Sequence, residues 1–138
     1  ETRSGSERLS AHPPSLRILL IDDEVEVRRI LADMLTADGH TVIEAAGGGE
    51  GLARLEAGES VDLVLTDLGM PEMTGWDVMR AVRAGWPGLQ VGLITGWRAE
   101  LVGTEEERGE ADFTVAKPVT FEALRRAIGP IRPRPVEY

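Results

Sequence analysis

The sequence predicts an α/β fold, a doubly wound five-stranded parallel sheet with helices on both of its faces. Short, nearly continuous apolar segments alternate with segments of helical periodicity, and this alternation occurs five times. Strands that are apolar on both sides are typical of a sheet covered on both faces. Regular alternation of strand and helix indicates parallel strands joined by crossover helices. The binding site of such a fold lies beyond the carboxyl ends of the strands.

The first strand and the first helix are the most clearly marked elements. Residues 16–21 form an apolar run that stops abruptly at Asp22 and Asp23. Apolar residues then recur at the spacing of one helical face, which predicts a helix. Asp38 and Gly39 supply the signal that ends it. The apolar residues of this face are Val27, Ile30, Leu31, Met34 and Leu35.

The middle of the chain repeats the pattern. We expect a strand at 41–45, a glycine turn at 47–49, a helix at 50–57, a strand at 61–66, a helix at 76–84 and a strand at 90–95. The strand at 61–66 leads directly to a carboxylate, Asp67, and the strand at 90–95 ends in the hydroxyl of Thr95. Each strand therefore delivers a polar group to the same edge of the sheet.

The last part of the chain is less regular. Residues 98–109 contain few large apolar side chains, and we expect a short, loosely packed helix there. A final strand at 113–116 leads to Lys117 and Pro118. The final helix covers 120–128, with Thr120 as its N-cap.

Composition excludes several classes of function. The 138 residues contain no cysteine, so disulfides, thiolate metal sites and cysteine nucleophiles are excluded. The formal charge of −9 disfavours direct binding to nucleic acid. No apolar run approaches the roughly 20 residues of a membrane span, and no signal peptide is indicated, so we expect a cytoplasmic location without membrane insertion.

The chain is long enough for one domain. We expect a flexible tail or linker at 1–15, a domain at 16–129 and a C-terminal tail at 130–138. Because so few residues follow the last expected helix, we expect no output domain in this chain.

Five side chains converge at the predicted site: Asp22, Asp23, Asp67, Thr95 and Lys117. Crowded carboxylates raise one another's pKa unless a cation lies between them. Oxygen ligands without a His or Cys cluster suit Mg²⁺, with Mn²⁺ as the alternative. A metal, a lysine and a hydroxyl around one carboxylate form a receptor for a phosphoryl group, with Asp67 as the nucleophile.

Four segments at these strand ends resemble the receiver domains of two-component response regulators, in particular chemotaxis regulators and the receivers of hybrid sensor histidine kinases. They read ILLIDDE at 18–24, LTDLGMPEMTGW at 65–76, LITG at 93–96 and AKP at 116–118. The resemblance implies the flavodoxin-like strand order 2-1-3-4-5. It also implies a cis peptide before Pro118 and a phosphorelay function as a phosphoprotein of signal transduction.

The resemblance implies a role for each site residue. Asp23 and Asp67 would ligate Mg²⁺ directly, Asp22 would act through water, and the Gly69 backbone carbonyl would complete the protein's ligands. Asp67 would be the phosphoacceptor, with Thr95 and Lys117 on the phosphate oxygens.

The implied partner is a histidine kinase or a histidine phosphotransfer domain. The chain would catalyse its own phosphorylation and dephosphorylation without turning over an external substrate. If it forms a homodimer, the family implies the face of the fourth and fifth helices. The chain is either a stand-alone receiver or one excised from a hybrid kinase or multidomain regulator.

Two departures from the family pattern affect how phosphorylation would be read out and how long the phosphorylated form would last. Receivers commonly place Tyr or Phe three residues before the lysine, where this chain has Thr114. Either a shift in the last strand lets Phe113 act as the aromatic residue that reports phosphorylation, or Thr95 couples to a different readout. Gly69 offers no side chain beside Asp67 to orient a hydrolytic water, and Trp97 directly follows the LITG segment at 93–96, where it could shield the site. We therefore expect these two positions to set the rate of dephosphorylation.

Two alternative functions compete with the phosphoacceptor. A magnesium-dependent phosphatase with an aspartate nucleophile would usually carry a second acid two residues later, where this chain has Gly69. A pseudo-receiver that serves only as an interaction module would not need the complete set of acids, hydroxyl and lysine.

Overall fold

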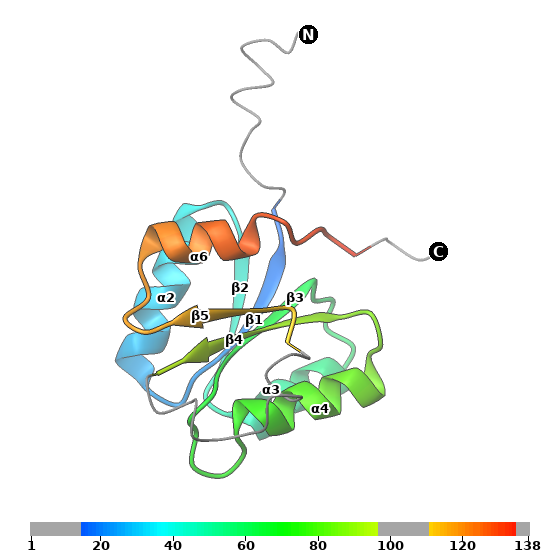
Figure 1. Ribbon diagram of the computed structural model, residues 1–138. Coiled ribbons are helices and arrows are strands. Elements are labelled where there is room, and N and C mark those ends of the chain that lie inside the picture. The colour runs from blue at the N-terminus through cyan, green and yellow to red at the C-terminus, as the bar shows by residue number, and fades with distance from the viewer. Residues whose placement is uncertain (1–14, 97–110, 135–138) are drawn as a thin grey trace, which may run out of the picture.

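The computed structural model describes residues 15–96 and 111–134, which form a sheet between helices (Figure 1). The elements in chain order are β1 (Arg17–Ile21), α2 (Val25–Ala37), β2 (Thr41–Ala45), α3 (Gly48–Glu56), β3 (Leu63–Asp67), α4 (Gly75–Gly85), β4 (Gln90–Thr95), β5 (Phe113–Ala116) and α6 (Phe121–Ile128). The helix expected within 98–109 lies outside the described residues.

The five strands form one sheet in the order β2-β1-β3-β4-β5, and every neighbouring pair is parallel. The predicted fold class and strand order are therefore confirmed. The order reverses at β1, whose two neighbours are β2 and β3. Since parallel strands end at a common edge, β1, β3, β4 and β5 deliver their last residues to one side of the molecule.

Two separate apolar layers hold the sheet between its helices. Leu31 and Leu35 of α2 and Leu124 of α6 pack against one face, which Figure 1 shows covered by these two helices. Leu55 of α3 and Val78 of α4 pack against the other face. All five residues of β3 are buried, as the apolar run at its centre predicts.

The helix starts differ from expectation in one instructive place. The expected glycine turn at 47–49 already contains the first turn of α3, which begins at Gly48 rather than Glu50. A Cβ at Gly48 would lie 2.5 Å from the Met73 sulfur and 2.9 Å from Val78, so the absent side chain lets α3 approach the β3–α4 connection. At α6, Thr120 accepts a hydrogen bond from the Ala123 amide, which confirms the predicted N-cap.

The last strand runs without a shift in register. Phe113 lies opposite Gly92 of β4, and Thr114 lies opposite Leu93. The ring of Phe113 lies against Gly92 and packs into the layer beneath α2 and α6. Because successive strand residues point to opposite faces, Thr114 is directed to the other face. The structure therefore shows no strand shift that would put Phe113 in the place of Thr114.

The segment after α6 stays on the body of the domain. Ile131 is buried in the same apolar layer as α6, and the Arg134 amide donates to the Asp62 carboxylate at 2.8 Å. The other Asp62 oxygen accepts from the Arg17 amide at the start of β1, also at 2.8 Å. Asp62 thus ties the C-terminal segment to the edge of the sheet opposite the candidate site.

Among the residues that the structure describes, no helix is both long enough and apolar enough to cross a bilayer.

The contact between Gly92 and the Phe113 ring gives a stability prediction. A Cβ at position 92 would collide with the ring, so Gly92→Ala forces β4 and β5 apart or displaces Phe113. We expect the free energy of unfolding, measured by urea denaturation, to fall by about 1–3 kcal/mol. The control is Gly49→Ala, at an exposed helical position with open space around it, which we expect to be neutral or stabilising by up to about 1 kcal/mol. Equal effects of the two substitutions would contradict the packing argument.

Candidate functional site

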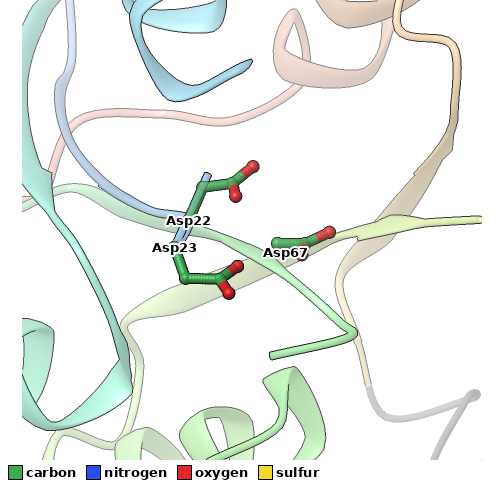
Figure 2. A group of neighbouring side chains, drawn as sticks. All are labelled: Asp22, Asp23 and Asp67. Atoms are coloured by element: carbon green, nitrogen blue, oxygen red, sulfur yellow. The ribbon is translucent and has the colours of Figure 1, made fainter. Parts of the chain in front are cut away.

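Three carboxylates meet where β1 and β3 end. Oxygen atoms of Asp22, Asp23 and Asp67 all lie within 4.8 Å of one another, close enough to hold one metal ion (Figure 2). Asp22 and Asp67 are buried, whereas Asp23 is exposed. The sequence predicted this group, and the parallel pairing of β1 with β3 is what brings its members together.

Asp22 is fixed at almost every polar atom. Its amide donates to the Ala45 carbonyl at 3.1 Å, and its Oδ1 accepts from the Glu24 amide at 2.9 Å. Its Oδ2 is buried and has no hydrogen-bond partner among the described residues. A buried carboxylate oxygen without a partner is costly, so this atom is suited to a cation or to an ordered water held by one.

Lys117 supplies a positive charge next to Asp67. Its Nζ lies 2.9 Å from Asp67 Oδ1, and the Asp67 side chain is 5% exposed. The Lys117 amide donates to the Thr95 carbonyl at 2.8 Å, which continues the pairing of β5 with β4 and carries the lysine to the edge. The peptide between Lys117 and Pro118 is cis, as the family resemblance implies.

Burial disfavours the ionised forms of two of the three carboxylates. Burial raises the pKa of Asp22 from 3.8 to about 6, a rise limited by the Glu24 amide and increased by the Asp67 charge. Burial also raises the pKa of Asp67, although Lys117 acts against it. For Lys117, burial lowers the pKa, but the hydrogen bond and charge of Asp67 outweigh it, so its pKa is raised.

The site therefore fits a hard divalent cation. It offers oxygen atoms alone, a buried carboxylate oxygen that lacks a partner, and three acids against one lysine. A cation between these acids would favour their ionised forms, which burial disfavours in its absence.

The other predicted positions lie at the same edge. Thr95 ends β4 and is half-buried. Gly69 is exposed in the connection after β3, and the space where a side chain would stand is open. The neighbouring Gly75 lets α4 begin against the backbone of this connection, since a Cβ there would lie 2.8 Å from the Asp67 carbonyl oxygen. Trp97 lies outside the described residues.

One polar group near the site was missed by the sequence reasoning. Arg28 of α2 donates from Nη1 to the Asp22 carbonyl at 2.8 Å and from Nε to Glu44 of β2 at 2.9 Å. The apolar periodicity defined the buried face of this helix and gave no reason to examine its charged residues. The sequence did contain a signal for this contact, because Arg28 lies about one turn into a helix that begins just after Asp22 and Asp23.

The raised pKa of Asp22 predicts how stability depends on pH in the presence of EDTA. Between about pH 4 and pH 6 the folded protein keeps a proton that the unfolded chain has released, so stability falls as pH rises through this interval. Asp22→Asn removes this loss. At pH 7 we expect the variant to be more stable than the parent protein by up to about 3 kcal/mol, since one pKa unit corresponds to about 1.36 kcal/mol.

Urea denaturation of both proteins at several pH values measures this difference. We expect the two stabilities to be closest near pH 4 and to diverge towards neutral pH. Parallel pH curves would show that burial of Asp22 does not control the effect.

Sequence comparison places this site in a known context. Residues 18–129 match the family described as the response regulator receiver domain. The chain is 36% identical over 120 residues to the transcriptional regulatory protein GlrR of Escherichia coli, covering 86% of this chain but 26% of that protein. It is 33% identical over 118 residues to a chemotaxis protein CheY homolog of Campylobacter jejuni, covering 82% of this chain and 89% of that protein. The chain thus spans about a quarter of the first relative and most of the second.

Solved structures agree with the sequence comparison. A response regulator receiver domain protein from Clostridium thermocellum superposes with a TM-score of 0.74 at 33% identity, covering 81% of this chain and 90% of that one. The response regulator protein TrrA from Thermotoga maritima, in complex with Mg(2+)-BeF, gives a TM-score of 0.72 at 28% identity, covering 81% and 95%. The chain belongs to the response regulator receiver domain family of two-component signalling.

Proposed function

We propose that this domain is a phosphoaccepting switch that takes a phosphoryl group from a phosphohistidine donor onto Asp67 and then interacts differently with a partner. The observation that carries the proposal is the buried Asp67 carboxylate, 2.9 Å from Lys117 and grouped with Asp22 and Asp23. A nucleophile, a cation and a group of metal-binding acids at one strand edge form a phosphoryl-transfer site.

Asp67 is the nucleophile. One of its carboxylate oxygens forms a bond to phosphorus while the bond between phosphorus and the histidine nitrogen of the donor breaks, and the electron pair stays on that nitrogen. Lys117 favours the ionised form of Asp67 and offers a positive charge to the phosphoryl oxygens, which carry the developing charge. Thr95, at the end of β4, supplies a hydroxyl for the same oxygens.

The proposed metal is Mg²⁺, with Mn²⁺ as the alternative. Asp23 and Asp67 would hold it directly, Asp22 through water, and the Gly69 backbone carbonyl would add a further oxygen. When bound, the ion neutralises charge on the acids and on the incoming phosphoryl group. The complex of TrrA with Mg(2+)-BeF supports this proposal for a related fold.

A phosphatase that hydrolyses external phosphoesters is less well supported. Such an enzyme needs an acid to protonate the leaving group. The position two residues after Asp67 is Gly69, which is exposed and has open space where a side chain would stand. We therefore propose phosphorylation and dephosphorylation of the domain itself, without an external substrate.

The proposed partner is a histidine kinase or a histidine phosphotransfer domain in the cytoplasm. The relatives include a protein about four times longer than the matched region and another of nearly the same length. A role within a larger regulator and a role as a separate receiver are therefore both open for the whole protein. The face proposed for a homodimer includes the segment 98–109, which lies outside the described residues.

Mass spectrometry tests whether Asp67 is the acceptor. After incubation with acetyl phosphate and Mg²⁺, we expect the intact mass of the full chain to increase by one phosphoryl group, and we expect no increase for Asp67→Asn. The matched control is Asp33→Asn, which changes an exposed aspartate of α2 and should behave like the parent protein. Absence of any gain in the parent protein, or an equal gain in Asp67→Asn, would refute the proposed acceptor.

The role of Asp23 as a metal ligand can be tested by measuring Mg²⁺ affinity. Asp23→Asn removes the exposed carboxylate of the group, so we expect the Kd for Mg²⁺ to rise about tenfold or more, because affinity depends on the number of charged ligands. Isothermal titration calorimetry measures the change, with Asp33→Asn again as the control. Phosphorylation by acetyl phosphate should also stop in EDTA. An unchanged Kd would remove Asp23 from the proposed metal ligands.

A further inference from the structure

Arg28 is the polar group next to the site that the proposed function leaves without a role. It lies on α2 with its side chain 14% exposed, and it bridges two elements. Its Nε is 2.9 Å from Glu44 of β2, and its Nη1 is 2.8 Å from the backbone carbonyl of Asp22. The planar guanidinium can make both contacts at once in fixed directions, which a lysine ammonium on its flexible chain cannot reproduce.

The position of the Asp22 carbonyl oxygen affects the position of Asp23. It belongs to the planar peptide that leads into Asp23, so fixing this oxygen also fixes the direction in which Asp23 leaves β1. The Asp22 amide on the other side is already held by Ala45. With Arg28 on the carbonyl, the backbone of Asp22 is fixed from both sides.

Asp23 depends on this backbone support. Its side chain is exposed, and among the described residues no hydrogen bond holds its carboxylate in one position. Asp67, in contrast, is buried and paired with Lys117. The placement of the exposed acid is therefore set by the peptide before it.

The guanidinium of Arg28 is partly shielded from water, since its side chain is 14% exposed and that of Glu44 is 32% exposed. Partial removal of the two groups from water carries a desolvation cost that an ion pair alone often fails to offset. The additional bond to the Asp22 carbonyl explains why the guanidinium is placed between β2 and the acids.

We propose that Arg28 is a positioning residue that gives the acidic site its preference for Mg²⁺ by holding the peptide between Asp22 and Asp23. This inference rests on the proposed function, because it assumes that these acids bind Mg²⁺. Mg²⁺ requires nearly ideal octahedral geometry, whereas Ca²⁺ accepts a flexible and irregular ligand set. Loss of positioning therefore weakens Mg²⁺ binding more than Ca²⁺ binding, whereas loss of the positive charge alone would strengthen the binding of both cations, because a cationic group near the site repels them.

The test compares Arg28→Met and Arg28→Lys with Arg29→Met in the full chain. Arg29 is the adjacent exposed residue, so its substitution removes the same charge from the same helix. Amide chemical-shift titrations give the Kd values for Mg²⁺ and Ca²⁺ and show that each variant is folded. Urea denaturation in EDTA measures stability separately.

We expect both Arg28 variants to bind Mg²⁺ about tenfold more weakly, as removal of a group that orients metal ligands typically does. Their Kd for Ca²⁺ should change less, and Arg29→Met should match the parent protein. A lower stability of the Arg28 variants in EDTA with unchanged Kd values would show a purely structural role and overturn the proposal. Parent-like Mg²⁺ affinity in Arg28→Lys would show that the directed contacts of the guanidinium are not needed, and equal losses in the Arg28 and Arg29 variants would show an effect that does not depend on those contacts. Either result would also overturn the proposal.

Glu44→Ala keeps Arg28 but removes its anchor on β2, and it provides the measurement if the Arg28 variants do not fold. We expect a smaller loss of Mg²⁺ affinity in the same direction, and an unchanged ratio of the Mg²⁺ and Ca²⁺ affinities would contradict the proposal. If the parent protein itself fails to bind Mg²⁺, the proposed function fails, which is a different outcome from a variant that binds like the parent.

Discussion

The ion pair between Lys117 and Asp67 is the interaction on which the site depends. Three carboxylates gather at one sheet edge, and the Lys117 Nζ is 2.9 Å from the carboxylate of Asp67, the acid that we propose as the nucleophile. Burial favours the protonated forms of Asp22 and Asp67, whereas the proposed phosphoryl transfer requires an ionised Asp67. The lysine opposes this effect of burial on Asp67, and the remaining excess of negative charge suits a divalent cation.

The rest of the fold serves to place these groups. The strands β1, β3, β4 and β5 are mostly apolar, and each ends at or directly before a polar residue of the site, so burial of the sheet places these polar residues at one edge. Close contacts at glycines add to this arrangement. Gly75 lets α4 begin against the backbone of Asp67, and Gly92 leaves room for the Phe113 ring in the apolar layer beneath α2 and α6. These contacts hold the strands that carry Thr95 and Lys117 in register.

The last strand differs from the pattern that the family resemblance led us to expect. That pattern has an aromatic residue three residues before the lysine, but this chain has Thr114 there, and Phe113 lies on the opposite face of the sheet. Phe113 supports the core beneath α2 and α6, so its movement would disturb packing rather than report on Asp67. A readout that depends on a rotating aromatic ring at this strand therefore has no group to carry it among the described residues of β5.

The sequence by itself determined the fold class, the order of the elements and the set of acids, hydroxyl and lysine at the strand ends. These follow from local patterns, because apolar runs and helical periodicity report burial, and the end of a parallel strand predicts the edge where its next residue lies. Tertiary structure alone decided which atoms pair. The Asp22 oxygen without a partner, the bridge of Arg28 from Glu44 to the Asp22 carbonyl, and the early start of α3 at Gly48 all depend on side chains from separate elements. Their distances are set by strand register and helix packing, and local periodicity carries no information about either.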